Sequence, residues 1–187
     1  MEAGAHSLKL SYEDYLYFPD DGKRHELIDG EHYVTPAPNL KHQTSVVNLS
    51  GDLRSFVRPR KLGKIWVAPV DVLLSEHDVV QPDLVFLSKD RMDLAADGAK
   101  VTGAPDLVVE VLSPRTRRTD AVTKRHLYEK YGVSEYWMVD PELETVEVYR
   151  LTAGRFRREA ELSAEREDVL TSPLFPGLEI SISAIFE

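Results

Sequence analysis

The sequence contains no cysteine, which excludes disulfide bonds, thiolate catalysis and cysteine-ligated zinc sites. It has no apolar run that approaches the roughly 18 residues needed to cross a bilayer. Residues 1–10 also lack the basic head and the apolar stretch of a secretory signal. We therefore expect a protein without membrane contact, and cytoplasmic localisation is the default expectation.

Positive charge is scarce overall, since 32 acidic residues outnumber 23 lysines and arginines and the formal net charge is -9. A protein that binds nucleic acid through the phosphate backbone alone is normally basic, so this balance argues mildly against such a partner without excluding it. The basic residues gather in three runs, each most simply interpreted as solvated surface. These runs are Arg54, Arg58, Arg60, Lys61 and Lys64; Arg115, Arg117, Arg118, Lys124 and Arg125; and Arg155, Arg157 and Arg158.

The composition, with 42% hydrophobic and 29% charged residues in a chain of 187, fits one globular domain over residues 1–187. Apolar spacing predicts long helices over 39–58, ended by Pro59, and over 119–131; Ser11 can cap a short helix to about residue 18. Asp29-Gly30 predicts a hairpin between 25–28 and 31–34. Further strands are expected over 65–74, 79–87, 107–112, 135–139, 145–151, 156–162 and 178–182. This order favours an α+β fold, with a mixed β-sheet flanked by two helices and preceded by an N-terminal helix and hairpin.

One acid interrupts the apolar run 107–112. In a strand, Glu110 shares a face with Val108 and Leu112. A carboxylate there is costly unless it meets a metal, a cation or hydrogen-bond donors. The simpler alternative is an acid at the end of a sheet that pairs with an arginine. Asp83, which follows Pro82 at the start of another strand, gives a weaker signal, because a turn aspartate explains it equally well.

Lys124 lies on the apolar face of its predicted helix. At 100° per residue, Ala121, Leu127, Tyr128 and Tyr131 all fall within about 60° of the lysine. A lysine that faces a sheet needs an anionic partner, unless its side chain extends to reach water. The carboxylates of Asp83 and Glu110 are the obvious candidates. We predict that these two acids converge within about 4–6 Å, with Lys124 nearby, because one bridging ion requires it.

Two acids and an inward lysine form a chemically coherent set. Carboxylate oxygens bind Mg²⁺ or Mn²⁺, which can generate a hydroxide nucleophile and stabilise charge on a phosphate. The lysine can orient or deprotonate the attacking water, or stabilise the transition state.

The chain resembles the PD-(D/E)XK, or restriction-endonuclease-like, superfamily, and more closely a bacterial endonuclease family abundant in cyanobacteria. The matching stretches are HELIDGE at 25–31, QPDLVF at 81–86, APDLVVEVLSP at 104–114, DAVTKRHLYEKYGVSEYWMVDP at 120–141 and FPGLEI at 175–180. The resemblance implies a restriction-endonuclease-like core. It implies that Asp83 and Glu110 are catalytic metal ligands for Mg²⁺ or Mn²⁺. Leu112 stands where the common pattern has lysine, and Lys124 on the next helix matches the place to which this family moves it.

Three further residues are weaker candidates. Asp106, in a second Pro-Asp pair, would share one short strand with Glu110 and is a poor alternative to Asp83. Glu26 and His42 could add a ligand or a supporting contact, although a surface acid of the hairpin and a histidine of the first helical turn are slightly favoured.

The expected function is that of a metal-dependent endonuclease acting on nucleic acid, with DNA as the substrate. A two-fold homodimer would suit the cutting of both strands. The main alternative is a nuclease-fold domain that binds nucleic acid or a protein partner without cutting. A glycosidase that uses Asp83 and Glu110 as its carboxylate pair is a third reading, but it leaves Lys124 without a role.

Overall fold

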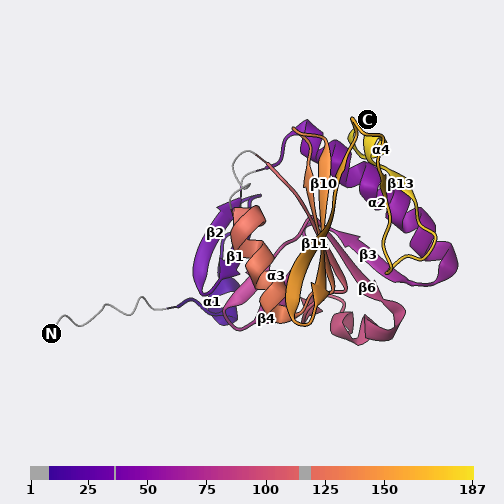
Figure 1. Ribbon diagram of the computed structural model, residues 1–187. Helices are drawn as coiled ribbons and strands as arrows, with labels where there is room; N and C mark the ends of the chain where they lie inside the picture. Colours follow the sequence, from indigo (N-terminus) through magenta and orange to yellow (C-terminus); the bar gives the residue numbers. More distant parts are fainter. Residues whose placement is uncertain (1–8, 36, 114–118) are drawn as a thin grey trace.

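A computed structural model describes residues 9–35, 37–113 and 119–187, and a six-stranded mixed sheet forms its centre (Figure 1). The strand order is β11-β10-β9-β8-β6-β3, in which β8 and β9 are parallel and the other neighbours antiparallel. The strands are β3 Gly63–Val67, β6 Leu84–Ser88, β8 Leu107–Val111, β9 Glu135–Asp140, β10 Thr145–Thr152 and β11 Arg155–Ser163.

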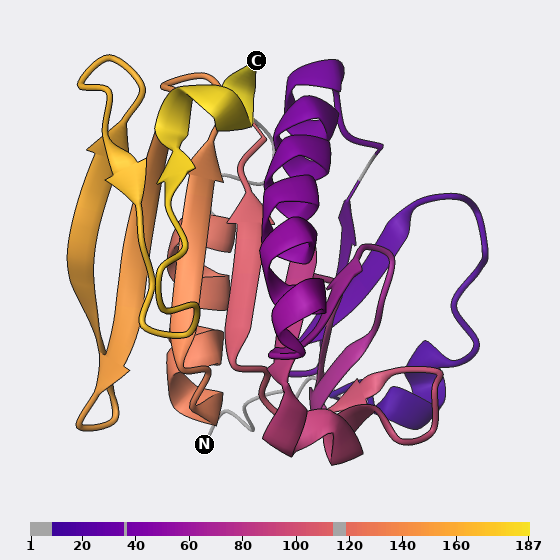
Figure 2. The same cartoon turned by 90° about the vertical axis from the view of Figure 1, so that its right-hand side faces the viewer.

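Helices cover both faces of this sheet, which explains why β8 is apolar on both sides. Leu107, Val109 and Val111 of β8 belong to the core shared with α2, Leu40–Arg60. Val108 and Leu112 belong to the opposite core, shared with α3, Arg125–Tyr131. Figures 1 and 2 show α2 and the short α4, Ile182–Phe186, on one side of the sheet and α3 on the other. The predicted α+β class and the two flanking helices are confirmed.

The long helix α2 begins as its sequence predicts and ends two residues later. The Asn39 side chain caps it by accepting a hydrogen bond from the N–H of His42 at 2.9 Å. The prediction that Pro59 ends the helix was wrong, because a proline in the last turn removes a single intrahelical donor. The helix instead stops at Lys61, whose φ of 55° is left-handed.

A second sheet, with the order β2-β1-β5-β4-β7, carries the N-terminal hairpin. Its strands are β1 Arg24–Ile28, β2 Glu31–Thr35, β4 Val72–Ser75, β5 Asp78–Val80 and β7 Val101–Thr102. Asp29 and Gly30 have φ values of 52° and 74°, the two left-handed positions of a tight hairpin turn. The helix α1, Tyr12–Tyr15, has the expected Ser11 cap but ends before residue 18.

Two predicted strands were wrong, because each one divides between the two sheets. The stretch predicted as 65–74 supplies β3 to the six-stranded sheet and β4 to the other. The stretch predicted as 79–87 supplies β5 and β6 in the same way. The chain therefore crosses between the sheets near residues 68–71 and 81–83. The N–H of Ala68 donates to the carbonyl of Asp83 at 3.0 Å, so the crossings are bonded to each other.

The segment that carries Lys124 is helical but begins with a wider turn. A π-helical turn η2, Thr119–Lys124, leads into α3, and Gly132 ends the helix with a φ of 81°. A 3₁₀ helix η1, Lys89–Ala95, follows β6. The predicted last strand, 178–182, was largely wrong: β13 is only Ile180–Ser181, paired with β12, Val169–Leu170, before α4 begins. Within the described ranges, no helix has the length and apolar character required to span a membrane.

Candidate active site

Asp83 is buried at a crossing between the sheets, with only 2% of its surface exposed. Its Oδ2 accepts the backbone N–H of Val111 at 2.8 Å and lies 3.2 Å from Nε2 of His42. Its Oδ1 lies 2.6 Å from the guanidinium of Arg24. The register of β6 against β8 pairs Leu84 with Val109, so Asp83 lies opposite Glu110. The structure therefore brings these two predicted acids to neighbouring positions on adjacent strands.

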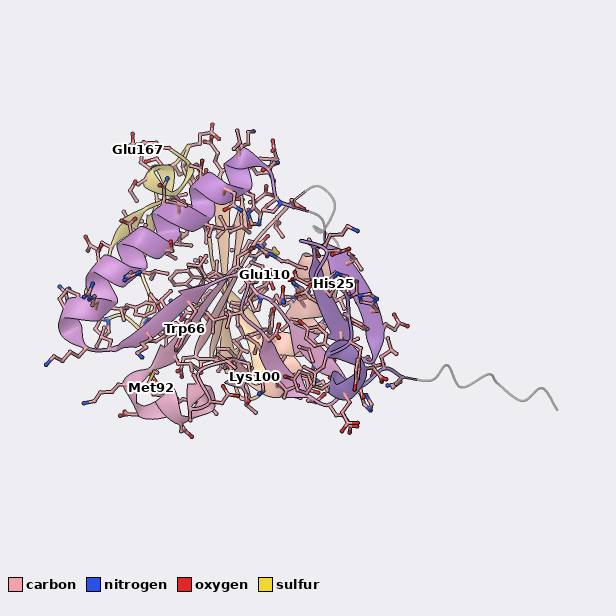
Figure 3. The ribbon with its side chains drawn as sticks, turned by 180° about the vertical axis from the view of Figure 1, so that it is seen from behind. His25, Trp66, Met92, Lys100, Glu110 and Glu167 are labelled. Carbon is pink, nitrogen blue, oxygen red and sulfur yellow. The ribbon has the colours of Figure 1, made fainter. Side chains whose placement is uncertain are left out.

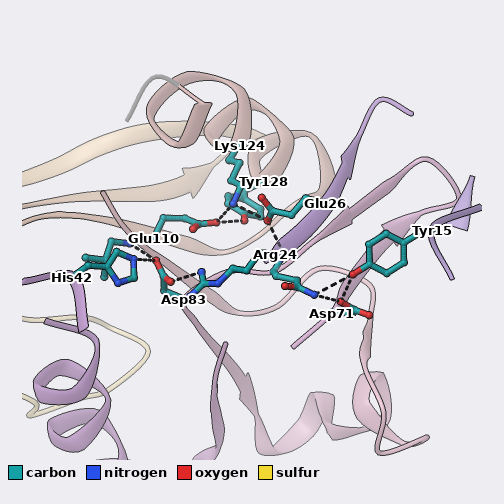
Figure 4. Close-up of polar contacts among 11 residues, drawn as sticks. Tyr15, Arg24, Glu26, His42, Asp71, Asp83, Glu110, Lys124 and Tyr128 are labelled. Carbon is teal, nitrogen blue, oxygen red and sulfur yellow. Dashed lines mark hydrogen bonds and ion pairs between the residues drawn. The ribbon is translucent and has the colours of Figure 1, made fainter. Parts of the chain in front are cut away.

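Glu110 and Lys124 are in direct contact. Figure 3 shows Glu110 between α2 and the hairpin, and Figure 4 shows the contacts around it. The Nζ of Lys124 lies 3.1 Å from Oε1 of Glu110 and 2.8 Å from Oε1 of Glu26. The hydroxyl of Tyr128, one turn further along the helix, donates to the same Oε1 of Glu110 at 2.6 Å. Since Lys124 is only 4% exposed, it does not extend to water, and the lysine faces the sheet as its helical phase predicts.

Burial and charge set the protonation of these groups. Burial alone would raise the pKa of Asp83, but the hydrogen bond from His42 and the charge of Arg24 outweigh it, so the pKa is lowered. Burial raises the pKa of Tyr128 well above its usual value, and the negative charges of Glu110 and Glu26 raise it further. Asp83 is therefore ionised near neutral pH, and Tyr128 keeps the proton that it donates to Glu110.

Arg24 is a central residue that the sequence reasoning missed. Burial lowers its pKa, but attraction to Asp83, and then to Glu110 and Glu26, outweighs this, so the pKa is raised. One guanidinium thus attracts three carboxylates, from β1, the crossing before β6, and β8. The sequence did contain a signal for Arg24 as a site residue, because Arg24 and Glu26 are two residues apart in one strand and share a face.

Glu26 and His42 are both buried. The slightly favoured interpretation of Glu26 as a surface acid was therefore wrong, whereas His42 does lie in the first turn of α2, as expected. Glu26 accepts the backbone N–H of Gln81 at 2.7 Å in addition to its contact with Lys124. His42 lies on the buried face of α2, four residues before Val46, and its Nε2 faces Asp83. Among the described residues, the buried Nδ1 of His42 has no hydrogen-bond partner.

The second Pro-Asp pair has a structural task. Asp106 accepts the backbone N–H of Ser88 at 2.7 Å and lies 3.0 Å from the guanidinium of Arg91. These bonds hold η1 against the end of the sheet, and none of them involves Glu110.

The donor set of Asp83 and Glu110 fits a hard divalent cation. Mg²⁺ commonly binds to one or two carboxylates and keeps several waters, so two acids suffice, whereas zinc prefers nitrogen or sulfur ligands. In the part of the chain that the structure describes, no group of three or more histidine and acidic side chains is close enough together to hold one metal ion. A metal at Asp83 would compete with the guanidinium of Arg24, which already contacts Oδ1.

A depression of about 420 Å³ borders this cluster and reaches Arg24. Its lining residues are Asp20, Gly22, Lys23, Arg24, Thr35, Ala37, Pro38, Pro69 and Gln81. Since 22% of the Arg24 side chain is exposed, this residue links the buried acids to solvent.

Comparisons with known proteins identify the family and the fold. The sequence model of the Uma2 family, described as "Putative restriction endonuclease", matches residues 12–183. A solved structure from Anabaena variabilis, described as a "putative nuclease belonging to DUF820", superposes with a TM-score of 0.79 at 22% identity and covers 95% of this chain and 97% of that one. No curated protein matches significantly. The superposition shows the shared fold, and the family match over most of the length shows that this chain belongs to the Uma2 family of restriction-endonuclease-like proteins.

Proposed function

We propose that this protein is a metal-dependent endonuclease that hydrolyses phosphodiester bonds in DNA. Mg²⁺ or Mn²⁺ would be held by Asp83 and Glu110. The observation that carries the proposal is the buried contact of Lys124 with Glu110. Asp83 lies beside this pair, because it accepts a hydrogen bond from the backbone N–H of Val111, the residue after Glu110. Two acids and a lysine buried together from three separate segments are costly to the fold, and such clusters concentrate at functional sites.

The chain's own residues have distinct tasks in this proposal. The metal, when bound, supplies a Lewis acid and a hydroxide nucleophile. Lys124 orients the attacking water or stabilises charge on the phosphate. Glu26, at 2.8 Å from Nζ, holds that lysine in position. The hydroxyl of Tyr128 fixes the carboxylate of Glu110.

A second candidate function is binding of nucleic acid without cleavage. The oxygens of Asp83 already contact Arg24, His42 and the N–H of Val111, so this acid has three polar partners without a metal. If Arg24 is never displaced, the site remains a neutralised structural cluster.

Cleavage of supercoiled plasmid DNA with Mg²⁺ or Mn²⁺ distinguishes the two functions. Lys124→Met removes the ammonium and keeps most of the apolar stem, and cleavage should fall by about 10²-fold or more. Lys130→Met is the matched control, since this side chain is 59% exposed and lies 3.4 Å from Asp78, outside the cluster. The control should cut like the unmodified protein.

Each protein is compared below its own melting temperature, because Lys124 separates two buried carboxylates and its loss also costs stability. Equal cleavage by the unmodified protein and Lys124→Met would remove the lysine from the mechanism. Absence of cleavage by every protein, with either metal, would favour binding without cutting.

A further inference from the structure

A groove far from the acid cluster is lined by basic residues. It has a volume of about 550 Å³ and lies where the end of α2, β3 and η1 meet. Its floor is apolar, formed by Val57, Ile65 and Met92 beside Gly63. Five exposed basic side chains complete it, and no acid is among its lining residues. The five are Arg54, Arg58, Lys61, Lys64 and Lys89.

These five cations have no carboxylate within 4.0 Å among the described residues. Elsewhere in the described ranges most lysines and arginines are paired, as Lys41 is with Glu142 and Arg166 with Asp168. The remaining cations of these ranges are paired in the same way, except Arg60, Arg125 and Arg157. The protein has a net charge of -9, so a groove lined by cations and by no acid is a local region of positive charge on a negative molecule.

Helix stability does not account for this concentration of charge. Basic residues in a last turn do interact favourably with the helix dipole, which explains Arg58. However, Lys64 lies on β3 and Lys89 on η1, and Arg54 is more than a turn from the end of α2. Cations from three elements converge on one space, which is the arrangement expected for an anionic ligand.

The position of the groove indicates which anion it binds. Arg58 and His42 lie on the same helix, and sixteen residues at 1.5 Å each separate them by about 24 Å. In Figure 3, Met92 marks the groove and Glu110 the acid cluster at the two ends of this span. In duplex DNA, 24 Å corresponds to about seven base pairs. A ligand held by both regions must therefore be a long polyanion.

We propose that this groove binds the phosphate backbone of duplex DNA about seven base pairs from the cleavage site. The proposal rests on the proposed function for its choice of polyanion. The backbone contacts are independent of base sequence and position the duplex for the acid cluster. An acidic protein would also be attracted to the groove, but it has no reason to span the distance to His42.

Binding of a short fluorescein-labelled duplex, measured by anisotropy in EDTA, tests the groove without cleavage. The variant carries Arg54→Gln, Arg58→Gln and Lys64→Gln together. The matched control carries Arg155→Gln, Arg157→Gln and Arg158→Gln, which changes the net charge equally on the distant strand β11. The groove variant should bind roughly tenfold more weakly or worse, and its slope of log K against log salt should fall by about 2 to 3. The control should change both only slightly.

Three results would overturn the proposal. The first is that the unmodified protein binds no duplex. The second is that the two triple variants weaken binding equally. The third is that poly-glutamate displaces the duplex as well as unlabelled DNA does. The last result would identify a site for acidic protein. If the triple variant unfolds, the single changes Arg58→Gln and Lys64→Gln replace it, each expected to lower the salt slope by about 1.

A small substrate separates this proposal from the proposed function. Bis(p-nitrophenyl) phosphate is too small to extend the roughly 24 Å from the acid cluster to the groove, a distance fixed by the length of α2. The groove variant should therefore hydrolyse it like the unmodified protein while losing activity on duplex DNA. If the groove variant cleaves duplex DNA as well as the unmodified protein does, the proposal for the groove is refuted and the proposed nuclease function is not. If duplex binding depends on the groove but no protein cleaves, the nuclease function is refuted and the proposal for the groove is not.

Discussion

Replacing Arg24 by glutamine tests whether its guanidinium competes with a metal ion for Asp83. The guanidinium lies 2.6 Å from Oδ1 of Asp83 and within electrostatic reach of Glu110 and Glu26. Glutamine keeps the polar character and much of the length of the side chain but removes its positive charge. Without that charge, a divalent cation becomes the strongest available partner for the acids.

The contact sets the size of the expected effect. A hydrogen bond between charged groups contributes about 1.5–3 kcal/mol. Because 22% of the Arg24 side chain is exposed, solvent screens the contact and the lower half of that range applies. Every 1.4 kcal/mol is about tenfold in an equilibrium constant. Arg24→Gln should therefore bind Mn²⁺ about tenfold more tightly, while the metal-free protein becomes less stable.

Isothermal titration calorimetry with Mn²⁺ gives the affinity, and thermal melting with and without metal gives the two stabilities. Lys23→Gln serves as the control, since Lys23 is the neighbouring cation but pairs with Asp21 at 2.9 Å and is 52% exposed. Its affinity for Mn²⁺ should stay within about twofold of the unmodified protein. Metal binding by Arg24→Gln that is no tighter than in the control would refute the competition.

Three further predictions concern the same cluster. Glu110→Gln should abolish the rise in melting temperature that Mn²⁺ produces, and an undiminished rise would show that Glu110 is not a ligand. Tyr128→Phe removes a buried donor 2.6 Å from Glu110 and should lower the free energy of unfolding by about 1–3 kcal/mol in urea titrations; a loss near zero would mean that Glu110 needs no such donor. The pKa of Asp83 is lower in the folded protein than in the unfolded chain, so its contribution to stability is full above about pH 4 and is lost as pH falls below that value. The free energy of unfolding, measured in urea from pH 7 to pH 2, should therefore fall less steeply for Asp83→Asn than for the unmodified protein. Parallel pH curves for the two proteins would contradict this.

Periodicity was sufficient to predict the burial of Glu110 and Lys124. The strand alternation of β8 and the helical phase of the Lys124 segment are local properties, and each placed one charged residue on an apolar face. The hairpin turn at Asp29 and Gly30 was predictable for the same reason, because its left-handed backbone depends on adjacent residues.

The division of strands between two sheets could not be predicted in this way. Only Gln81, Pro82 and Asp83 separate the apolar residues of β5 from those of β6, and both strands are buried, so the sequence shows no clear break between them. Only long-range pairing, β5 with β1 and β6 with β8, decides where one strand ends. The polar neighbourhoods of Glu26 and His42 misled for a related reason. Their burial depends on partners from distant segments, which a local window does not contain.

The crossing at Gln81–Asp83 makes the acid cluster a joint property of both sheets. Arg24 and Glu26 come from the five-stranded sheet, and Glu110 comes from the six-stranded one. Local unfolding that releases the hairpin removes Arg24 from Asp83 and Glu26 from Lys124 at once. A newly made chain in which only one sheet has formed thus lacks the complete cluster. Any activity that requires the complete cluster is then restricted to the fully folded molecule, without a separate inhibitor.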